Sequence, residues 1–192
     1  MSEKLSFKRC NESDFAKLLR LQDAIFDTLP DTTLLRRNAP EMLYSCLSEP
    51  HYTLGAWDND LLVAVSILYI PQVAAEDLSL SLLDSTRSLP ASWQRNHSLN
   101  NNNLPTLSSI TRKANNKLCL VLPRYRGHNL QLLLGWMIEQ EAVQRGIQLL
   151  CATASPDNAA SCRSLEKQGY RLNCRLVKYG YPRNLYAKNI AI

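Results

Sequence analysis

Two apolar strand-like runs enclose one long helix between residues 117 and 154, and this arrangement constrains the fold more than any other segment. KLCLVLP at 117–123 and IQLLCATA at 147–154 have the length and apolar content of buried strands. The helix expected between them, at 128–145, ends at Gly146 and carries one apolar stripe: Leu130, Leu133, Leu134, Met137 and Ile138. Strands that alternate with helices are typical of α/β proteins.

Further strands and helices flank this unit and predict an α/β (α+β) chain with a mixed central sheet of about seven strands and four helices. Strands are expected at 4–10, 52–57, 61–70, 170–180 and 183–190. Helices are expected from Asn11 to Pro30, at 39–48, and from the opening residues 155–158 to Gly169. The expected order is strand, helix, helix, strand, strand, insertion, strand, helix, strand, helix, strand, strand.

Local signals fix several boundaries. Asn11 is the expected N-cap of the first helix, because Asp14 stands three residues later in a capping-box arrangement. The residues between the second and third strands, 58–60, are Asp-Asn-Asp and predict a hairpin turn. A closing hairpin is expected to turn around Tyr181-Pro182.

Residues 72–116 do not follow this pattern. The segment is rich in Ser, Leu and Asn, shows no sustained period and includes an Asn run at 100–103. We interpret it as a partly mobile insertion within one domain that spans 1–192. A substrate lid is the functional alternative, because long loops in compact domains are often functional.

Composition excludes several classes of protein. The apolar runs at 61–70 and 130–138 fall short of the roughly 20 residues that span a bilayer, and the N-terminus lacks the apolar core of a secretory signal. We therefore expect a cytoplasmic protein without a membrane partner. The net charge of +5 is spread along the chain and is only compatible with an anionic ligand.

Cysteine and histidine positions give no metal site. The six cysteines form no C-x-x-C pair and are interpreted as reduced thiols. The three histidines stand far apart and lack ligand spacing, so we expect no metal. Cys119 and Cys162 have no histidine identifiably beside them, which favours a core role over acyl-cysteine catalysis.

The junction VLPRYRGHNLQ at 121–131 is the strongest candidate site. A strand, an arginine-containing turn and a helix N-terminus present unbonded N–H groups and the positive end of the helix dipole, which together bind phosphate. Gly127 allows close backbone approach, and the Arg126 guanidinium can add a charge-assisted bond. An ordinary strand-to-helix turn with surface arginines is the plain alternative. Neither a P-loop nor a dinucleotide-binding glycine motif occurs in the chain.

The same junction resembles the acetyl-CoA pyrophosphate loop of the GNAT N-acetyltransferase superfamily, in which Val-x-Pro-x-Tyr-Arg-Gly leads into Gln/Arg-x-x-Gly-x-Gly/Ala. A second segment, ASPDNAASCRSLEKQGY at 154–170, resembles the family's Asn-containing helix that ends in Lys-x-Gly-Phe/Tyr and flanks the pantetheine arm. With the order of the elements, the resemblance covers nearly the whole chain except the insertion.

The resemblance implies a coenzyme site and a reaction. It assigns acetyl-CoA, as cosubstrate, to these residues: Leu120, Val121, Leu122, Arg126, Gly127, His128, Asn129, Leu130, Gln131, Asn158 and Ser161. It implies two diverging strands, near 117–123 and 147–154, with the pantetheine arm bonded to the main chain of the first. An amine of a small molecule or protein then attacks the thioester directly, with a main-chain N–H as oxyanion donor.

Three positions depart from the family pattern. Asn129 and Gln131 stand where the family has glycine and Gly/Ala; asparagine tolerates the left-handed conformation, whereas Gln131 must point away from the phosphates or donate to them. Leu165 stands where many members have the tyrosine that protonates the leaving thiolate. Tyr170, Tyr179 or a water is expected to do so instead.

The general base is assigned to Glu76, which with Asp77 follows the third strand. Solvated loop carboxylates are the alternative reading of this pair. Asp23, Asp27 and Asp31 could meet a cationic amine, but helix-end and turn roles are favoured for them.

Two rival functions remain from the residues. The departures at Asn129, Gln131 and Leu165 are compatible with a CoA-binding GNAT-like module with little or no turnover. Alternating cations and aromatics at 178–188 resemble a single-strand nucleic-acid groove, but also suit an outer hairpin with one wet face. We expect no nucleic-acid partner, and the prediction allows a homodimer.

Overall fold

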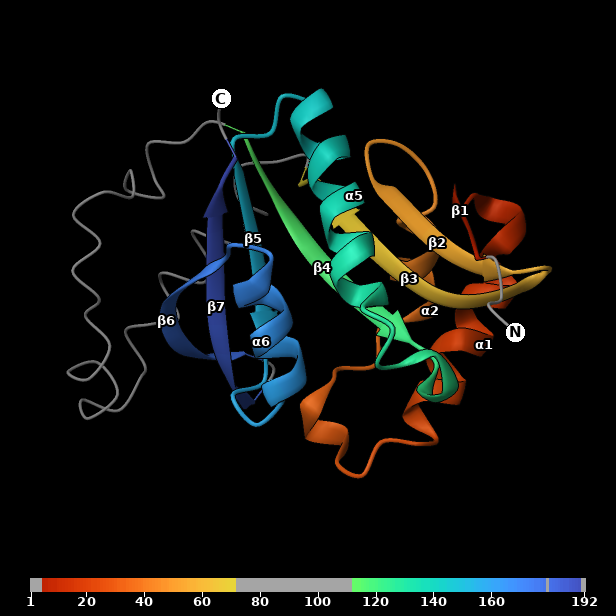
Figure 1. Ribbon diagram of the computed structural model, residues 1–192, viewed down its shortest axis with the longest axis horizontal. Helices are drawn as coiled ribbons and strands as arrows, with labels where there is room; N and C mark the ends of the chain where they lie inside the picture. Colours follow the sequence, from red (N-terminus) through yellow and green to blue (C-terminus); the bar gives the residue numbers. More distant parts are fainter. Residues whose placement is uncertain (1–4, 72–111, 179, 191–192) are drawn as a thin grey trace. The chain divides into compact units, whose positions relative to one another are not determined.

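The computed structural model describes residues 5–71, 112–178 and 180–190 (Figure 1). The strands are β1 (Ser6–Arg9), β2 (Tyr52–Asp58), β3 (Leu61–Tyr69), β4 (Lys113–Val121), β5 (Leu149–Ala154), β6 (Arg171–Lys178) and β7 (Tyr181–Asn189). The α-helices of the described ranges are α1 (Phe15–Phe26), α2 (Pro40–Ser45), α5 (Leu130–Gln144) and α6 (Ala159–Lys167). The strands form one mixed sheet in the order β1-β2-β3-β4-β5-β7-β6, which confirms the predicted fold class.

Two compact units divide the chain, and each is described by itself. Unit 1 comprises residues 1–69 and 116–141, and unit 2 comprises residues 70–115 and 142–192. The single domain spanning 1–192 therefore stays a prediction. None of the helices in the described ranges has the length and hydropathy needed to cross a bilayer.

The start of unit 1 follows its capping signal. The Asn11 side chain accepts the Ser13 N–H at 2.9 Å, and the Asp14 carboxylate accepts the Asn11 N–H at 3.2 Å. This capping box opens a short 3-10 turn that continues into α1, as predicted from the sequence. Unlike the predicted helix, which ran on toward Pro30, α1 ends at Phe26.

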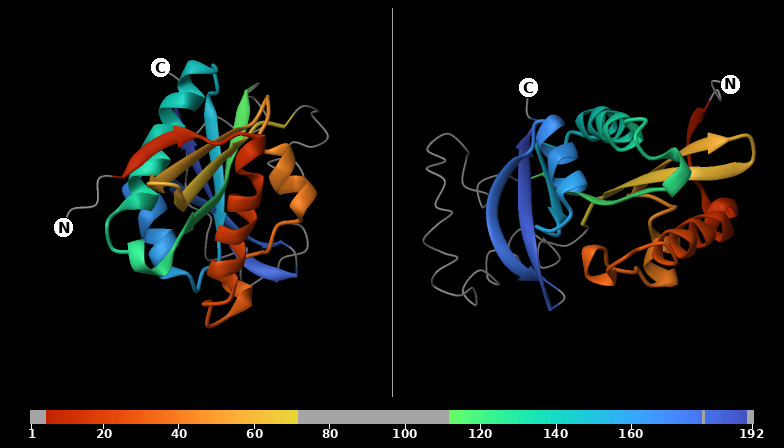
Figure 2. Two further views of the ribbon diagram at one scale, coloured as in Figure 1. Left: turned by 90° about the vertical axis from the view of Figure 1, so that its right-hand side faces the viewer. Right: turned by 60° about the horizontal axis from the view of Figure 1, so that its bottom comes forward.

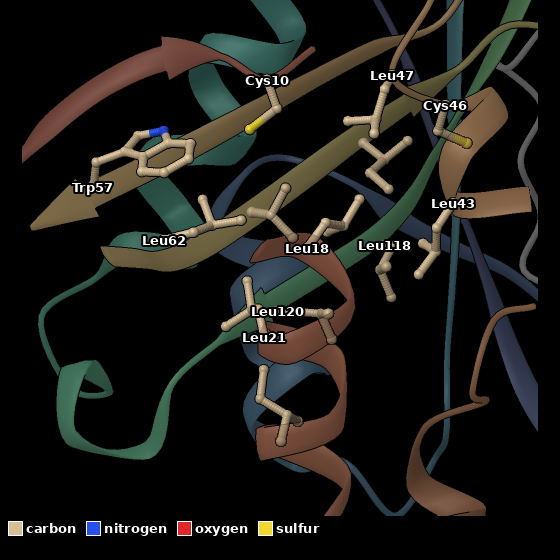
Figure 3. Close-up of a cluster of buried hydrophobic side chains, with 13 residues drawn as sticks. Cys10, Leu18, Leu21, Leu43, Cys46, Leu47, Trp57, Leu62, Leu118 and Leu120 are labelled. Carbon is tan, nitrogen blue, oxygen red and sulfur yellow. The ribbon is translucent and has the colours of Figure 1, made fainter. Parts of the chain in front are cut away.

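The main core of unit 1 lies between α1 and α2 and the strands beside them. Figure 3 shows Leu18 and Leu21 of α1 facing Leu62 of β3 and Leu118 and Leu120 of β4. These side chains are at most 4% exposed, and each fully buried leucine contributes about 1.5–3 kcal/mol relative to an exposed one. The core fixes the position of the β4 main chain, which leads directly to the candidate site.

The β2–β3 hairpin also lies in unit 1. Asp58 pairs with Leu61, so that the turn consists of Asn59 and Asp60, and Asn59 has a left-handed φ of 52°. The hairpin predicted at 58–60 is therefore confirmed, with Asp58 as the last strand residue. The Asp58 side chain is consequently held on a paired strand.

The first part of α5 covers the other face of the unit 1 strands, opposite α1 and α2 (Figure 2). Leu130, Leu134 and Ile138 are buried, but Leu133 is 38% exposed. The prediction of Leu133 in the buried stripe is wrong. The buried row follows the i, i+4 spacing, which leaves Leu133 at the margin of the covered face.

Unit 2 is built on an antiparallel group of strands. β7 pairs with both β5 and β6, and α6 packs on β5. Side chains on one face of these strands form a core cluster of Leu149, Cys151, Leu176, Leu185 and Ala187. Because alternate residues of a strand face opposite sides, Asn184 and Tyr186 of β7 lie on the face that contacts α6.

Two predicted boundaries in unit 2 are wrong. Residues 113–116, assigned to the insertion, belong to β4, and Lys113–Asn115 pair in parallel with Leu149–Cys151. Strand pairing overrides the low strand propensity of the polar sequence there. Tyr181 and Pro182, expected in the turn, are already part of β7, where they pair with Lys178 and Val177.

Candidate functional site

The end of β4 presents main-chain groups to both of its edges. The Leu122 N–H donates to the Val63 carbonyl of β3 at 2.9 Å. Since successive strand residues direct their main-chain groups to opposite edges, Leu120 also faces β3, whereas Val121 faces the other edge. Of the three residues predicted to bind pantetheine, Val121 is the one with this orientation.

The parallel ladder between β4 and β5 is short. It pairs Lys113–Asn115 with Leu149–Cys151, and β4 continues to Val121 beyond it. In this register the last residue of β5, Ala154, corresponds to Leu118, so a ladder along all of β5 would end before Val121. The expected divergence of the two strands stays a prediction.

The β4–α5 loop, residues 122–129, makes its turn with two left-handed residues. Pro123–Tyr125 form one 3-10 turn, after which Gly127 adopts φ 82° and Asn129 adopts φ 58°. The left-handed conformation expected for Asn129 is confirmed. A Cβ atom added at Gly127 would meet nothing within 4 Å, so the space beside this backbone is open. The glycine is required by its conformation, because side chains disfavour positive φ.

Several N–H groups at this junction have no acceptor in the protein. The Asn129 carbonyl accepts the first helical bond, from the Leu133 N–H at 3.0 Å. Among the described residues the N–H groups of Gly127, His128 and Leu130 donate no hydrogen bond. Together with the positive end of the helix dipole, these donors form an anion-binding arrangement.

The two arginines of the loop have different contacts. The Arg124 guanidinium lies 4.7 Å from the centroid of the Tyr125 ring and donates to the Tyr125 hydroxyl at 2.8 Å. The exposed Arg126 donates from Nε to the Val121 carbonyl at 3.3 Å. Its terminal N–H groups remain available to a ligand, so Arg126 is the better candidate for a phosphate contact.

Tyr125 anchors the loop to the β2–β3 hairpin. Its side chain is 6% exposed, and its hydroxyl donates to Oδ2 of Asp58 at 2.5 Å. The hydrogen bond to the carboxylate, followed by desolvation, raises the pKa of Tyr125 above its usual value. The phenol is therefore neutral at physiological pH and donates a hydrogen bond to Asp58.

The remaining predicted residues of the junction lie at the start of α5. His128 Nδ1 is 3.3 Å from the Tyr125 carbonyl, a contact that needs the proton on Nδ1. The Leu130 side chain is buried, and Gln131 is the second residue of α5 with a half-buried side chain. The structure thus brings together residues 126–131 of the predicted coenzyme site.

Asn158 and Ser161, also predicted to contact the coenzyme, form the N-cap of α6 in unit 2. The Asn158 Oδ1 accepts the Ser161 N–H at 3.1 Å. The cap uses the Asn158 oxygen and leaves the Nδ2 group as its donor. Leu165 of the same helix is 4% exposed. The position where many family members have a tyrosine is thus a core position in this chain.

The predicted catalytic residues have different outcomes. Glu76 and Asp77, the proposed base and its neighbour, lie outside the described residues. Tyr170 directly precedes β6, and its side chain is 3% exposed. Tyr179, named as an alternative proton donor, also lies outside the described residues.

Two cysteines were considered as nucleophiles: Cys119 has a raised pKa, and Cys162 is buried. Although the Cys119 side chain is partly exposed, desolvation raises its pKa to about 12. Cys162 is buried and donates to the Ser155 carbonyl at 3.4 Å. A thiol with so high a pKa is a poor nucleophile, so Cys119 is unsuited to acyl transfer.

The aspartates near the end of α1 serve the local fold. The Asp31 carboxylate accepts the Thr33 N–H at 2.8 Å, and this main-chain bond lowers its pKa. Asp23 forms an ion pair with Arg37. Both contacts support the turn and helix-end roles favoured from the sequence. Within the described ranges no group of three or more His, Cys, Asp or Glu residues could hold a metal ion.

Asp58, Arg124 and Tyr125 are not among the site residues predicted from the sequence. Tyr125 stands inside the quoted motif, and its position between two arginines was the available signal. Its partner Asp58 lies 67 residues away, so no local pattern could have identified the contact.

Comparison with known proteins identifies the fold. No family model and no curated protein sequence matches the chain. Among solved structures, Arabidopsis thaliana NAA60 in complex with acetyl-CoA has 15% sequence identity, a TM-score of 0.67 and coverage of 97% of this chain and 99% of that chain. A GNAT-family acetyltransferase from Streptococcus pneumoniae has 14% identity, a TM-score of 0.66 and coverage of 98% and 100%.

The Escherichia coli ribosomal-protein-S18-alanine N-acetyltransferase is similar at 13% identity, with a TM-score of 0.65 and coverage of 98% and 96%. These similarities extend over nearly the whole of each chain, and they show that this protein has the GNAT N-acetyltransferase fold. At such low identities they show the fold alone.

Proposed function

We propose that this protein, which has the GNAT N-acetyltransferase fold, transfers an acetyl group from acetyl-CoA to an amine by direct attack. The observation that carries the proposal is the set of unaccepted N–H groups at the start of α5, beside the exposed Arg126. The similar structures of acetyltransferases, one of them a complex with acetyl-CoA, support the choice of anion.

The residues present fit the diphosphate of the coenzyme. The N–H groups of Gly127, His128 and Leu130 donate to phosphate oxygens, and the Arg126 guanidinium adds a charge-assisted bond. The open space beside Gly127 allows a bulky anion to approach the backbone. Asn129 supplies the left-handed turn for which the family pattern has glycine.

The rest of the coenzyme extends from this position along β4. The Val121 carbonyl, which also accepts Arg126 Nε at 3.3 Å, is the proposed acceptor for the strand-like pantetheine arm at the outer edge of β4. In unit 2, the resemblance assigns Asn158 and Ser161 to the same coenzyme. Since Oδ1 of Asn158 caps α6, its contribution comes from the Nδ2 donors.

Acetyl-CoA supplies an acetyl thioester, whose carbonyl carbon forms the new bond to the amine nitrogen and whose sulfur leaves with the electron pair. The chain positions the neutral amine, and the Val121 N–H is the proposed donor to the developing oxyanion. A base or water accepts the proton lost by the nitrogen, and the departing sulfur gains a proton.

The acid and base are assigned to Tyr170 and Glu76. Glu76 keeps its proposed role as the acceptor of the amine proton through water. The Tyr170 side chain is 3% exposed, so its hydroxyl has little direct access to a bound thioester. Tyr170 would therefore protonate the sulfur through a bound water. Tyr170→Phe tests this role: it should lower kcat while the affinity for acetyl-CoA stays within about twofold.

The acceptor is an amine of a small molecule or protein, and we expect the protein to work in the cytoplasm without nucleic-acid, membrane or metal partners. A homodimer is compatible with this function.

A CoA-binding module without turnover is the second candidate function. The buried Leu165 at the position of the family's tyrosine favours it, because a proton donor for the leaving sulfur is then missing from α6.

Release of free CoA from acetyl-CoA in the presence of an amine panel tests the proposal. Acyl transfer predicts release that depends on a specific amine and saturates with it. Tight CoA binding with no release above spontaneous hydrolysis for every amine would support the module instead. Absence of any CoA binding would contradict both functions.

A further inference from the structure

Tyr125 differs from its neighbours in the β4–α5 loop. Of residues 123–129, all of which the structure describes, Tyr125 alone is buried, whereas both arginines and the residues after them are exposed. Tyr125 is therefore the side chain that connects residues 123–129 to the β2–β3 hairpin. The contacts of that side chain determine where the following N–H groups lie.

The Tyr125 hydroxyl is held from two sides. It donates to Oδ2 of Asp58 at 2.5 Å and accepts from Nη2 of Arg124 at 2.8 Å. Both partners are charged, and charge-assisted hydrogen bonds are about twice as strong as neutral ones. The Arg124 charge is thereby balanced by Asp58 through the phenol and is not needed for the ligand.

Asp58 itself is well fixed. It is the last residue of β2 and pairs with Leu61 across the hairpin. Its Oδ1 accepts the Asn59 Nδ2 group at 3.0 Å, which leaves Oδ2 directed to Tyr125. A carboxylate oriented in this way on a paired strand is a rigid reference point for the loop.

We propose that Asp58 is a positioning residue for the coenzyme site. By holding Tyr125, it fixes the path of the loop, so that the N–H groups of residues 127–130 and Arg126 already point at the diphosphate before binding. The inference rests on the proposed function, because the ligand is the diphosphate of CoA. Such preorganisation removes the cost of ordering the loop at the moment of binding.

The direction in which CoA affinity changes on replacement of Asp58 distinguishes a positioning role from a purely electrostatic effect. Asp58 brings a negative charge close to a site for an anion, so removal of that charge alone should strengthen CoA binding. A positioning role predicts the opposite, because loss of Asp58 releases Tyr125 and disorders the donors. The direction of the change in affinity therefore decides between the two.

The test uses Asp58→Ala, Asp58→Asn and Tyr125→Phe in the full chain, with Asp60→Ala as the matched control. Asp60 is the exposed carboxylate of the same turn, and its side chain forms no hydrogen bond or ion pair with the described loop residues. Calorimetric titration with CoA should show about tenfold weaker binding for Asp58→Ala and Tyr125→Phe, corresponding to loss of a charge-assisted bond. Asp58→Asn retains a neutral acceptor and should lose less, and Asp60→Ala should stay within about twofold.

Coupling and hydrogen exchange complete the test. Because Asp58 acts through Tyr125, the double variant should bind CoA no more than about twofold more weakly than either single variant. In the ligand-free protein, the amides of residues 126–130 should exchange faster in Asp58→Ala than in wild type or Asp60→Ala. This second measurement requires no coenzyme. Should Asp58→Ala fail to fold, Tyr125→Phe alone still tests both quantities.

The two possible failures are distinguishable. If wild type binds CoA and Asp58→Ala binds it equally or more tightly, or if the two substitutions are additive, the positioning role is overturned while the proposed function stands. If wild type binds no CoA, the proposed function fails and the role of Asp58 in CoA binding fails with it.

Discussion

Two strand-to-helix junctions of this protein, β4–α5 and β5–α6, use their N–H groups in opposite ways. At the β5–α6 junction in unit 2, Ser155 Oγ accepts the Asp157 N–H at 3.3 Å and Asn158 Oδ1 accepts the Ser161 N–H at 3.1 Å. At the β4–α5 junction in unit 1, the N–H groups of Gly127, His128 and Leu130 have no acceptor among the described residues.

The number of N–H groups without an acceptor indicates which of the two junctions can bind an anion through its main chain. The side chains at the start of α6 already accept two of the nearby N–H groups, so an anion there gains less from the main chain. The uncapped start of α5 keeps its donors in a loop that Tyr125 and Asp58 hold in place. We therefore propose the β4–α5 junction as the anion site, with side-chain donors from the β5–α6 junction at most.

The largest effect is expected for Arg126→Ala. Loss of one charge-assisted phosphate contact of about 1.5–3 kcal/mol should weaken acetyl-CoA binding roughly 10- to 150-fold without unfolding the protein. Calorimetry measures the affinity. Arg163→Ala, which removes an exposed arginine from α6, should leave it unchanged. Equal affinities of wild type and Arg126→Ala would remove this arginine from the site.

Gly127→Ala should have the next largest effect. Its φ of 82° costs an alanine about 1–2 kcal/mol, and no steric clash adds to this because a Cβ there has open space around it. Gly169→Ala, at φ 86° after α6, should destabilise the protein similarly. Denaturant unfolding measures both changes. Only Gly127→Ala should also weaken CoA binding; equal binding by the two variants would contradict the assignment of the loop.

Substitution of Asn158 tests the capped junction. Asn158→Ala removes the cap of α6 and should lower the free energy of unfolding by about 1 kcal/mol, whereas Asn158→Ser retains a cap and should lose much less. If the Nδ2 donors bind the coenzyme, both variants lose the same affinity despite their different stabilities. If CoA affinity instead falls only in Asn158→Ala, the less stable variant, Asn158 contributes to binding only by capping α6.

The smallest effect concerns pH. The Tyr125 pKa is raised above 10 by its bond to Asp58, so the stabilisation from this bond is complete below pH 10 and is lost as pH rises through the raised pKa. The difference in tyrosinate absorbance between wild type and Tyr125→Phe reports the titration of this residue. It should move toward lower pH in Asp58→Ala, and an unshifted titration would show that Asp58 does not set the pKa.

Local patterns predicted much of this molecule. The capping box at Asn11 and the hairpin at 58–60 depend on neighbouring residues, and both are confirmed. The left-handed conformation of Asn129 followed from its place in the motif and from the tolerance of asparagine for positive φ. Structural features that depend on a few neighbouring residues can be predicted from a single sequence.

Features that depend on distant partners were not predictable. The polar sequence at 113–116 becomes a strand through pairing with β5, and Leu133 is exposed because packing selects another row of α5. The contact of Tyr125 with Asp58 joins residues from a loop and a hairpin. Each of these outcomes is set by tertiary contacts that periodicity does not encode.

The most direct test of the open junction is a titration of the ¹⁵N-labelled protein with acetyl-CoA, followed through its amide resonances. The account predicts saturable shifts that are largest for the amides of Gly127, His128 and Leu130, with smaller changes at Asp157 and Ser161. Saturable binding that leaves the start of α5 unshifted, or no binding at all, would contradict it.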